Sequence, residues 1–184
     1  MIFVTVGHQM PFDRMIKAID EWAGQHERND IFAQIGDAAY TPKHIEWVRT
    51  LVPAEFAQRA ENADAIVAHA GMGTILTAMQ NGTPILVMPR TAARNETRND
   101  HQIATAKRFL EMGRVHVAMD ELELPEKLDQ LASMRSGGTI SSQASPMLIS
   151  ALRAFIHRTD DLAGMDLDGS KISDAPDQSP RTHT

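Results

Sequence analysis

Short apolar runs alternate along the chain with longer segments in which apolar residues recur every three or four positions. The short runs are rich in β-branched residues and mostly close at glycine or proline, which is typical of buried β-strands. They cover residues 2–6, 31–35, 65–68, 84–88 and 115–118, with a weaker candidate at 44–49. The longer segments predict amphipathic helices. They cover residues 12–22, 53–60, 74–81, 101–112, 122–132 and 146–157.

This alternation of strands and helices predicts an α/β fold. Strands joined through helices form a parallel sheet with helices on both faces. Right-handed crossovers make that sheet Rossmann-like. The pattern ends near residue 158, and residues 159–184 are rich in Asp, Ser and Pro and poor in apolar residues. We therefore expect one domain over residues 1–158 and a disordered tail over 159–184.

Composition narrows the functional classes. The chain has no cysteine, which excludes a disulfide scaffold, thiol catalysis and cysteine-ligated zinc. The formal net charge of −6 argues against a nucleic-acid partner. No apolar run reaches the roughly 18–20 residues of a membrane span, and the opening segment MIFVTVG has the pattern of a strand, without the basic leader of a signal peptide. We expect a cytoplasmic protein.

Three unusual loops follow predicted strands, at the sheet edge where open parallel sheets bind ligands. The first is Gly7-His8-Gln9-Met10-Pro11. Its glycine permits a tight turn, and the helix that follows offers free N–H groups to an anion. A polar loop after a glycine-terminated strand explains the same residues equally well.

The second loop, His69-Ala70-Gly71-Met72-Gly73-Thr74, lies between a strand and a helix. Its two glycines allow a ligand to approach the backbone, Thr74 adds a hydroxyl, and the helix dipole favours a diphosphate. Leu76 occupies the third glycine position of the dinucleotide fingerprint, so this is a cradle of a different kind. A histidine that only bonds the local backbone is an equally open interpretation of His69.

The third loop, Asn99-Asp100-His101-Gln102, opens a predicted helix. Asp100 is placed to cap that helix, and Gln102 to bond a ribose or phosphate. From the spacing alone, a simple capping motif is the better interpretation.

No metal site is expected. Asp166 and Asp168 have the spacing of a metal-binding acidic pair, but they lie in the predicted tail with no strand to present them. The eight histidines show no H-x-x-x-H or H-x-H spacing. We expect neither a metal nor another cofactor.

A set of short motifs follows in order along residues 1–131. They are Val4-Thr5-Val6-Gly7, Pro11-Phe12-Asp13-Arg14, Gln34-Ile35-Gly36, Ala63-Asp64, His69-Ala70-Gly71, Gly73-Thr74, Gly82 with Pro84, Val87-Met88-Pro89-Arg90, Glu96 and Asp100-His101-Gln102. Together they resemble the small subunits of two-part glycosyltransferases, in which one half of a GT-B enzyme is a separate protein. Similar chains include the soluble subunit of the dolichol-linked N-acetylglucosamine transferase, bacterial exopolysaccharide transferase subunits, and the carboxyl half of the transferase that makes peptidoglycan lipid II.

The resemblance implies a single GT-B half-domain whose Gly71–Thr74 turn holds the diphosphate of a UDP-sugar. The donor-binding residues that it implies are Gly7, His8, Gln9, His69, Gly71, Gly73, Thr74, Arg90, Glu96, His101 and Gln102. The chain departs from the family at His8, where threonine is common, and at Thr77, where an acidic residue is expected to bind the ribose. We expect Glu96 or Gln102 to take over that contact.

The activity implied is transfer of a hexosyl group from a UDP-sugar to a lipid-linked acceptor, in bacterial exopolysaccharide synthesis. A membrane-anchored partner would supply the other GT-B half, the acceptor site and the general base, and would recruit this chain to the inner face of the membrane. Two alternatives stay open. The chain is either a non-catalytic enhancer subunit, which retained UDP-sugar binding would argue against, or a stand-alone nucleotide-binding module, which activity without a partner would favour.

Overall fold

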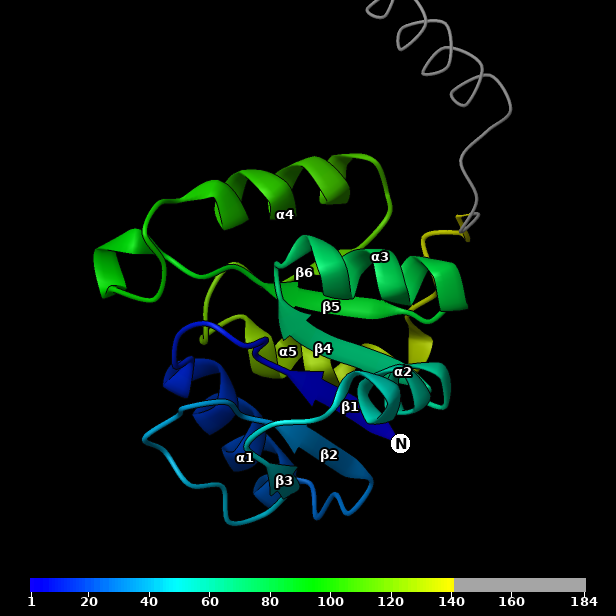
Figure 1. Ribbon diagram of the computed structural model, residues 1–184. Helices are drawn as coiled ribbons and strands as arrows, with labels where there is room; N and C mark the ends of the chain where they lie inside the picture. Colours follow the sequence, from blue (N-terminus) through cyan, green and yellow to red (C-terminus); the bar gives the residue numbers. More distant parts are fainter. Residues whose placement is uncertain (141–184) are drawn as a thin grey trace, which may run out of the picture. The chain divides into compact units, whose positions relative to one another are not determined.

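A six-stranded parallel sheet with the order β3-β2-β1-β4-β5-β6 forms the centre of the molecule (Figure 1). The computed structural model describes residues 1–140. The strands are β1 (Ile2–Thr5), β2 (Ile31–Gln34), β3 (Glu46–Val48), β4 (Ala65–His69), β5 (Ile85–Met88) and β6 (His116–Val117). The helices are α1 (Asp13–Gln25), α2 (Pro53–Glu61), α3 (Met72–Asn81), α4 (His101–Glu111) and α5 (Leu124–Asp129), with 3-10 turns η1 (Ala92–Arg94) and η2 (Leu131–Ser133).

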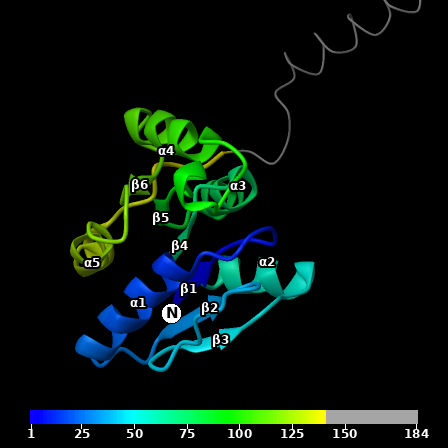
Figure 2. The ribbon, with the colours of Figure 1, turned by 90° about the vertical axis from the view of Figure 1, so that its left-hand side faces the viewer.

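Helices cover both faces of the sheet (Figure 2). The apolar faces of α1 and α5 pack on one side with Val4, Val67 and Leu86. The other side holds Phe3, Ile66 and Val87 against α2, α3 and α4. Because β1, β4 and β5 are buried on both faces, their sequences are continuous apolar runs instead of alternating ones.

The Rossmann-like α/β prediction is confirmed, including the weak strand candidate at 44–49, which contains β3. The helix predicted at 122–132 is shorter, because it breaks into α5 and η2. The helix predicted at 146–157, the domain boundary at 158 and the tail at 159–184 lie outside the described residues. Across residues 1–140, none of the helices has the length and apolar character to cross a lipid bilayer.

The strand order reverses between β1 and β4, which are neighbours in the sheet. Connections from these two strands run to opposite faces, so the loops after them separate and leave a crevice at their carboxyl ends. The loop after β1 starts at Gly7 and the loop after β4 at Ala70, which places the first two of the unusual loops on either side of this crevice.

Candidate functional site

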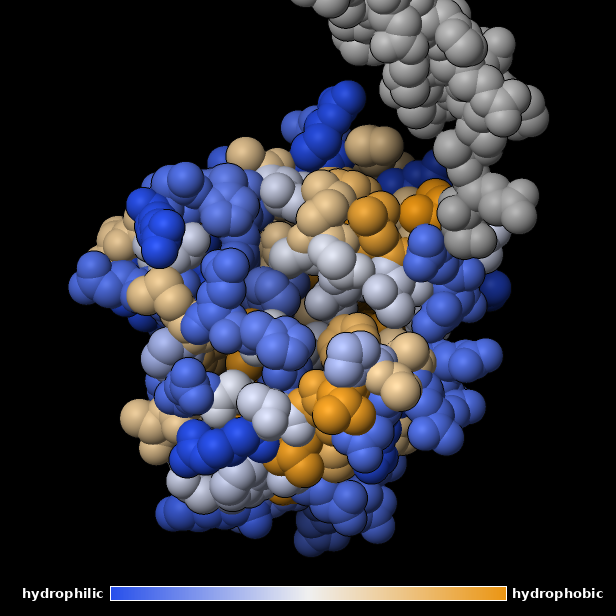
Figure 3. Space-filling view, in the orientation of Figure 1, coloured by the Kyte–Doolittle hydropathy of each residue, from blue (hydrophilic) through white to orange (hydrophobic). Residues whose placement is uncertain are grey.

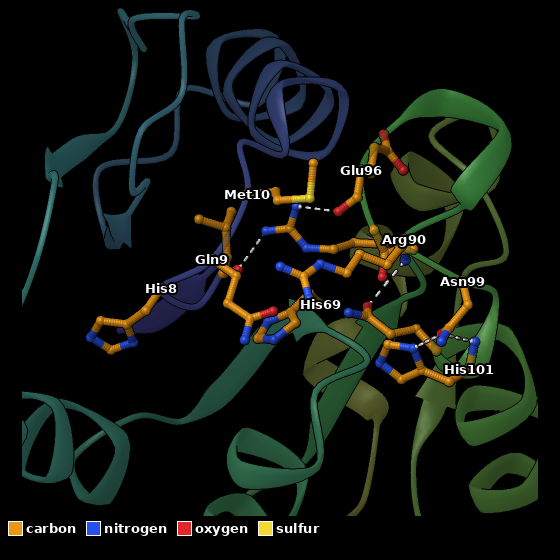
Figure 4. Close-up of a pocket in the computed structure, with 12 residues that line it drawn as sticks. His8, Gln9, Met10, His69, Arg90, Glu96, Asn99 and His101 are labelled. Atoms are coloured by element: carbon orange, nitrogen blue, oxygen red, sulfur yellow. Dashed lines mark hydrogen bonds between the residues drawn. The ribbon is translucent and has the colours of Figure 1, made fainter.

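Two adjoining pockets open at this crevice. The first, of about 490 Å³, is lined by polar residues of the β1, β5 and α4 loops. The second, of about 560 Å³, lies toward α2 and α3 and has an apolar wall of Leu51, Pro53 and Phe56. Both pockets share His8, Gln9, His69, His101 and Gln102. Figure 4 shows Gln9, His69 and His101 lying close together from segments far apart in the sequence, whereas His8 points away from them.

Every residue that the sequence proposed for donor binding lines one or both pockets. Arg90 and Glu96 lie in the first, and Gly7, Gly71, Gly73 and Thr74 in the second. The structure adds residues that the sequence analysis did not single out for the site. They are Val6, Thr97 and Arg98 in the first pocket, and Thr5, Leu51, Pro53 and Phe56 in the second. Met10 and Asn99, from the candidate loops, and Thr77, where the family has an acidic residue, line the pockets as well.

The amino terminus of α3 faces the second pocket without a side-chain cap. Gly71 is the N-cap residue, and the N–H groups of Met72, Gly73 and Thr74 have no hydrogen-bond partner within residues 1–140. A Cβ added at Gly73 would meet no atom within 4 Å. The free donors, the helix dipole and the open space above Gly73 together suit a phosphate group.

The other two glycines of these loops have a different role, because both are packed against the imidazole of His69. A Cβ on Gly71 would stand 2.2 Å from His69 Nε2, and a Cβ on Gly7 would stand 2.6 Å from its Cε1. Gly7 also has a φ of +75°, which favours glycine. The sequence analysis explained Gly71 by close approach of a ligand, whereas the structure shows that His69 already requires it.

Gly71→Ala is expected to destabilise the protein by about 2 kcal/mol, because the added Cβ displaces His69 in a packed site. His69→Ala should remove that penalty, so the double variant Gly71→Ala/His69→Ala should be no less stable than His69→Ala alone. Urea unfolding of the parent, both single variants and the double variant measures this coupling. Additive losses would show that the clash is not the cause.

His69 itself is held in its neutral form. Burial, together with the nearby charge of Arg90, lowers its pKa to about 4. An interaction with the backbone of Thr5 works in the opposite direction and raises the pKa. The Nδ1 of His69 is buried and has no hydrogen-bond partner within the described residues. A neutral imidazole at the junction of two pockets can donate or accept a hydrogen bond without adding charge.

Arg90 is buried beneath the first pocket, where its guanidinium joins the two loops that form it. It donates to the carbonyl oxygens of Val6 (2.7 Å), Pro11 (2.7 Å) and Glu96 (3.2 Å). Burial lowers its pKa to about 10, so it stays positive near neutral pH. No carboxylate of residues 1–140 forms an ion pair with it. Its charge is therefore free to attract an anion in the pocket.

The carboxylate of Glu96 is engaged by protein groups. It accepts hydrogen bonds from Arg14 Nε (2.6 Å), from Arg14 Nη2 (3.0 Å) and from the N–H of Thr91 (3.0 Å). Because these bonds occupy the carboxylate, the arrangement favours a role for Glu96 in holding the loop. It does not favour the ribose contact that we expected from the resemblance.

The start of α4 corrects the capping interpretation of the third loop. The Asp100 side chain makes no cap hydrogen bond and instead accepts the N–H of Ala92 at 2.8 Å. Gln102 is buried, and its Oε1 accepts the N–H of Arg90 at 3.2 Å. Its amide nitrogen has no hydrogen-bond partner among residues 1–140, and the residue lines both pockets. Gln102 therefore holds a free donor, as does the uncapped start of α3.

Two buried polar residues, Thr5 and Gln34, hold the start of the first loop by hydrogen bonds. Thr5 Oγ1 donates to Gln34 Oε1 at 2.5 Å, and Gln34 Nε2 donates to the carbonyl of Gly7 at 3.2 Å. Both residues occur in the motifs, but the apolar pattern of their strands gave them no separate signal. They fix the Gly7 turn beside His69.

The chemistry available here is that of anion stabilisation. Uncapped N–H groups of α3, the charge of Arg90 and the Gln102 amide all face the crevice, and such fixed donors stabilise a departing oxyanion strongly when water is excluded. Residues 1–140 contain no cluster of three or more acidic, histidine or cysteine side chains suited to a metal ion.

Known structures share this fold. ALG13 superposes with a TM-score of 0.54 at 17% identity, covering 77% of this chain and 90% of that chain. MurG from Acinetobacter baumannii gives 0.50 at 23% identity, covering 71% and 40%. The Methanocaldococcus jannaschii UDP-GlcNAc 2-epimerase, in complex with UDP-GlcNAc and UDP, gives 0.56 at 11%, covering 85% and 45%. The chain thus spans less than half the length of the two latter proteins.

No curated protein sequence matches the chain significantly. A protein-family model, however, matches residues 1–152, and its description is the glycosyltransferase family 28 C-terminal domain. Together with the six-stranded parallel sheet, this match confirms the predicted resemblance and the single GT-B half-domain. The chain belongs to the glycosyltransferase family 28 C-terminal domain family.

Proposed function

We propose that this chain is the donor-binding subunit of a two-part glycosyltransferase, which transfers a hexosyl group from a UDP-sugar to a lipid-linked acceptor in bacterial exopolysaccharide synthesis. The observation that carries the proposal is the uncapped start of α3, where Gly73 leaves open space in the second pocket. A diphosphate placed there would meet free N–H groups and lie near the positive charge of Arg90.

The two pockets suit the two ends of a nucleotide-sugar. The wall of Leu51, Pro53 and Phe56 in the second pocket offers the apolar contact that a nucleobase needs. The first pocket, lined by Gln9, Asn99 and other polar residues, offers hydrogen bonds for sugar hydroxyls. The diphosphate would then bridge the pockets past His69, and its charge would be stabilised on departure without a metal ion.

The acceptor and the general base would lie on a membrane-anchored partner that supplies the second half of the cleft and recruits this chain to the inner face of the membrane. Exposed apolar side chains around the pockets support a facing surface. Met10, Val52, Met72 and Leu76 are 38–59% exposed, and each lines a pocket or is next in sequence to a residue that does. Hydrophobic side chains gather on the α2 and α3 side of the face shown in Figure 3.

Gly73→Val is expected to weaken UDP binding at least tenfold, or by ~1.4 kcal/mol. The valine would occupy the space over the α3 amino terminus, while no protein atom within 4 Å opposes its Cβ. Isothermal titration calorimetry with UDP measures the change.

Gln80→Val is the matched control, because Gln80 is exposed on the same helix and lines neither pocket. It places the same β-branched residue in α3 and should keep the parent affinity. Equal UDP affinity in Gly73→Val and the parent would refute the phosphate cradle. A parent chain that binds no UDP but raises the activity of a partner would instead support the enhancer subunit.

A further inference from the structure

Four charged side chains of alternating sign form a chain of ion pairs beside the first pocket. Glu96 pairs with Arg14 at 2.6 Å, Arg14 with Glu121 at 2.7 Å, and Glu121 with Arg94 at 2.9 Å. Glu96 and Arg94 belong to the loop between β5 and α4, Arg14 to α1, and Glu121 to the segment before α5. The network therefore attaches an irregular loop to two helical parts of the scaffold.

Arg14 is the arginine that pairs with both carboxylates of the network and also contacts the loop backbone and Phe12. Its guanidinium also donates to the carbonyl of Pro89 at 2.9 Å and stacks on the buried ring of Phe12 at 5.0 Å. The guanidinium of Arg90 also lies over that ring, 4.7 Å from its centroid. The side chains of Arg14 and Glu96 are each only 11% exposed, so solvent screens their pairing less than it screens a surface pair.

The contacts within the network favour the charged forms of Arg14 and Glu121. Although burial works against the charged form, the hydrogen bonds that Arg14 donates to Glu96 and Glu121 raise its pKa. Burial likewise opposes the charge of Glu121, but hydrogen bonds from its own backbone and from Arg14 hold its pKa below the ordinary value. The ion pairs consequently persist through the neutral pH range.

The loop that the network holds forms most of one wall of the first pocket. Glu96, Thr97, Arg98 and Asn99 line that pocket and not the second. Apart from η1 the loop has no regular structure, so its conformational entropy opposes a fixed wall. Arg14 lines neither of the two pockets. It therefore acts on a ligand there through the residues it holds and not by direct contact.

We propose that Arg14 is a positioning residue that shapes the sugar-side pocket by fixing the 91–99 loop. This inference rests on the proposed function for the identity of the ligand. It assigns to Arg14 a selective effect on binding. Binding of the hexosyl end of a donor depends on the network. Binding of the nucleoside end, on the side of α2 and α3, does not.

The first test measures loop order without a ligand. In hydrogen exchange followed by mass spectrometry, Arg14→Met should speed exchange of the 91–99 amides by ~10-fold, as expected for a segment released from its tertiary contacts. Peptides from β4 and α3 should keep the parent rate. Unchanged exchange in the 91–99 segment would overturn the proposal.

The second test compares the two ends of the donor. Dissociation constants for uridine, UDP-glucose, UDP-galactose and UDP-N-acetylglucosamine are measured for the parent and for Arg14→Met. The variant should weaken the tightest UDP-hexose ~5-fold more than uridine, a difference of about 1 kcal/mol. Equal losses for both ligands would show general destabilisation and count against the proposal.

Three further variants distinguish the loss of the Arg14 network from the general effect of removing an arginine. Arg28→Met is the matched control, since Arg28 also pairs with a carboxylate (Asp30, 2.7 Å) and stacks on an aromatic ring (Trp22, 5.5 Å), but lines neither of the two pockets. It should leave exchange and the ligand ratio unchanged. Arg14→Lys should give an intermediate result, because one ammonium cannot bridge both carboxylates with Pro89.

Glu121→Gln weakens the pairs of Glu121 with Arg14 and Arg94 at a partly exposed site but keeps the pair of Arg14 with Glu96, so it is the variant to use if Arg14→Met fails to fold. It should still speed exchange in residues 91–99. A parent that binds none of the uridine ligands would contradict the proposed function alone, since the exchange result would decide the role of Arg14 by itself.

Discussion

Purified without a partner, the chain is expected to transfer sugar to a lipid-linked acceptor at least ~10⁵-fold more slowly than when the partner is present. One half-domain can hold the donor at strand ends and helix termini, but it has no facing wall to align the acceptor hydroxyl. Orientation contributes roughly 7–11 kcal/mol in well-aligned reactions, which corresponds to about 10⁵–10⁸ in rate.

The measurement is transfer from radiolabelled UDP-hexoses to lipid-linked acceptors, with the chain alone, with membranes that contain the partner, and with those membranes alone. Rapid transfer by the isolated chain would overturn the two-part proposal. Full transfer by the membranes alone would leave this chain no part in the reaction. UDP binding by calorimetry shows in parallel that the isolated chain is folded and competent.

Acidification from pH 6.5 to about pH 4 is expected to destabilise the protein by up to about 3 kcal/mol through His69 alone. The pKa of His69 in the folded protein is about 4, below the ordinary histidine value of 6.5, mainly because the ring is buried. Between these values the unfolded chain binds a proton that the folded chain does not. The stability contribution is therefore complete above pH 6.5 and is lost as the pH falls toward 4.

Urea unfolding of the parent and of His69→Gln at pH 7 and pH 4.5 measures this effect. Carboxylates elsewhere contribute equally to both proteins, so the difference between the two pH dependences isolates His69. The variant should lose less stability on acidification than the parent. Parallel losses in the two proteins would contradict a neutral, buried His69.

The order of strands and helices was predictable because local signals are strong in a parallel sheet. Both faces of β1, β4 and β5 are buried, so their runs are apolar except at Thr5 and His69, the last residues of β1 and β4, and glycine or proline follows most of the runs closely. The α5 region was predicted less well. Apolar spacing across residues 122–132 favoured one helix, but Leu122 is 84% exposed and the regular helix ends at Asp129.

The sequence by itself determined which loops form the site, since the carboxyl ends of parallel strands share one edge and the family motifs lie there. Only the tertiary structure decided what each residue does. Gly71 makes room for His69, Glu96 binds Arg14, and Asp100 holds Ala92 instead of capping α4. Arg14 and Glu96 are separated by 82 positions, and spacing along a chain carries no information about a hydrogen bond made across it. Such contacts arise only when packing brings the loops together, which is why Gly73 and Gly71 look alike in sequence and differ in the folded protein.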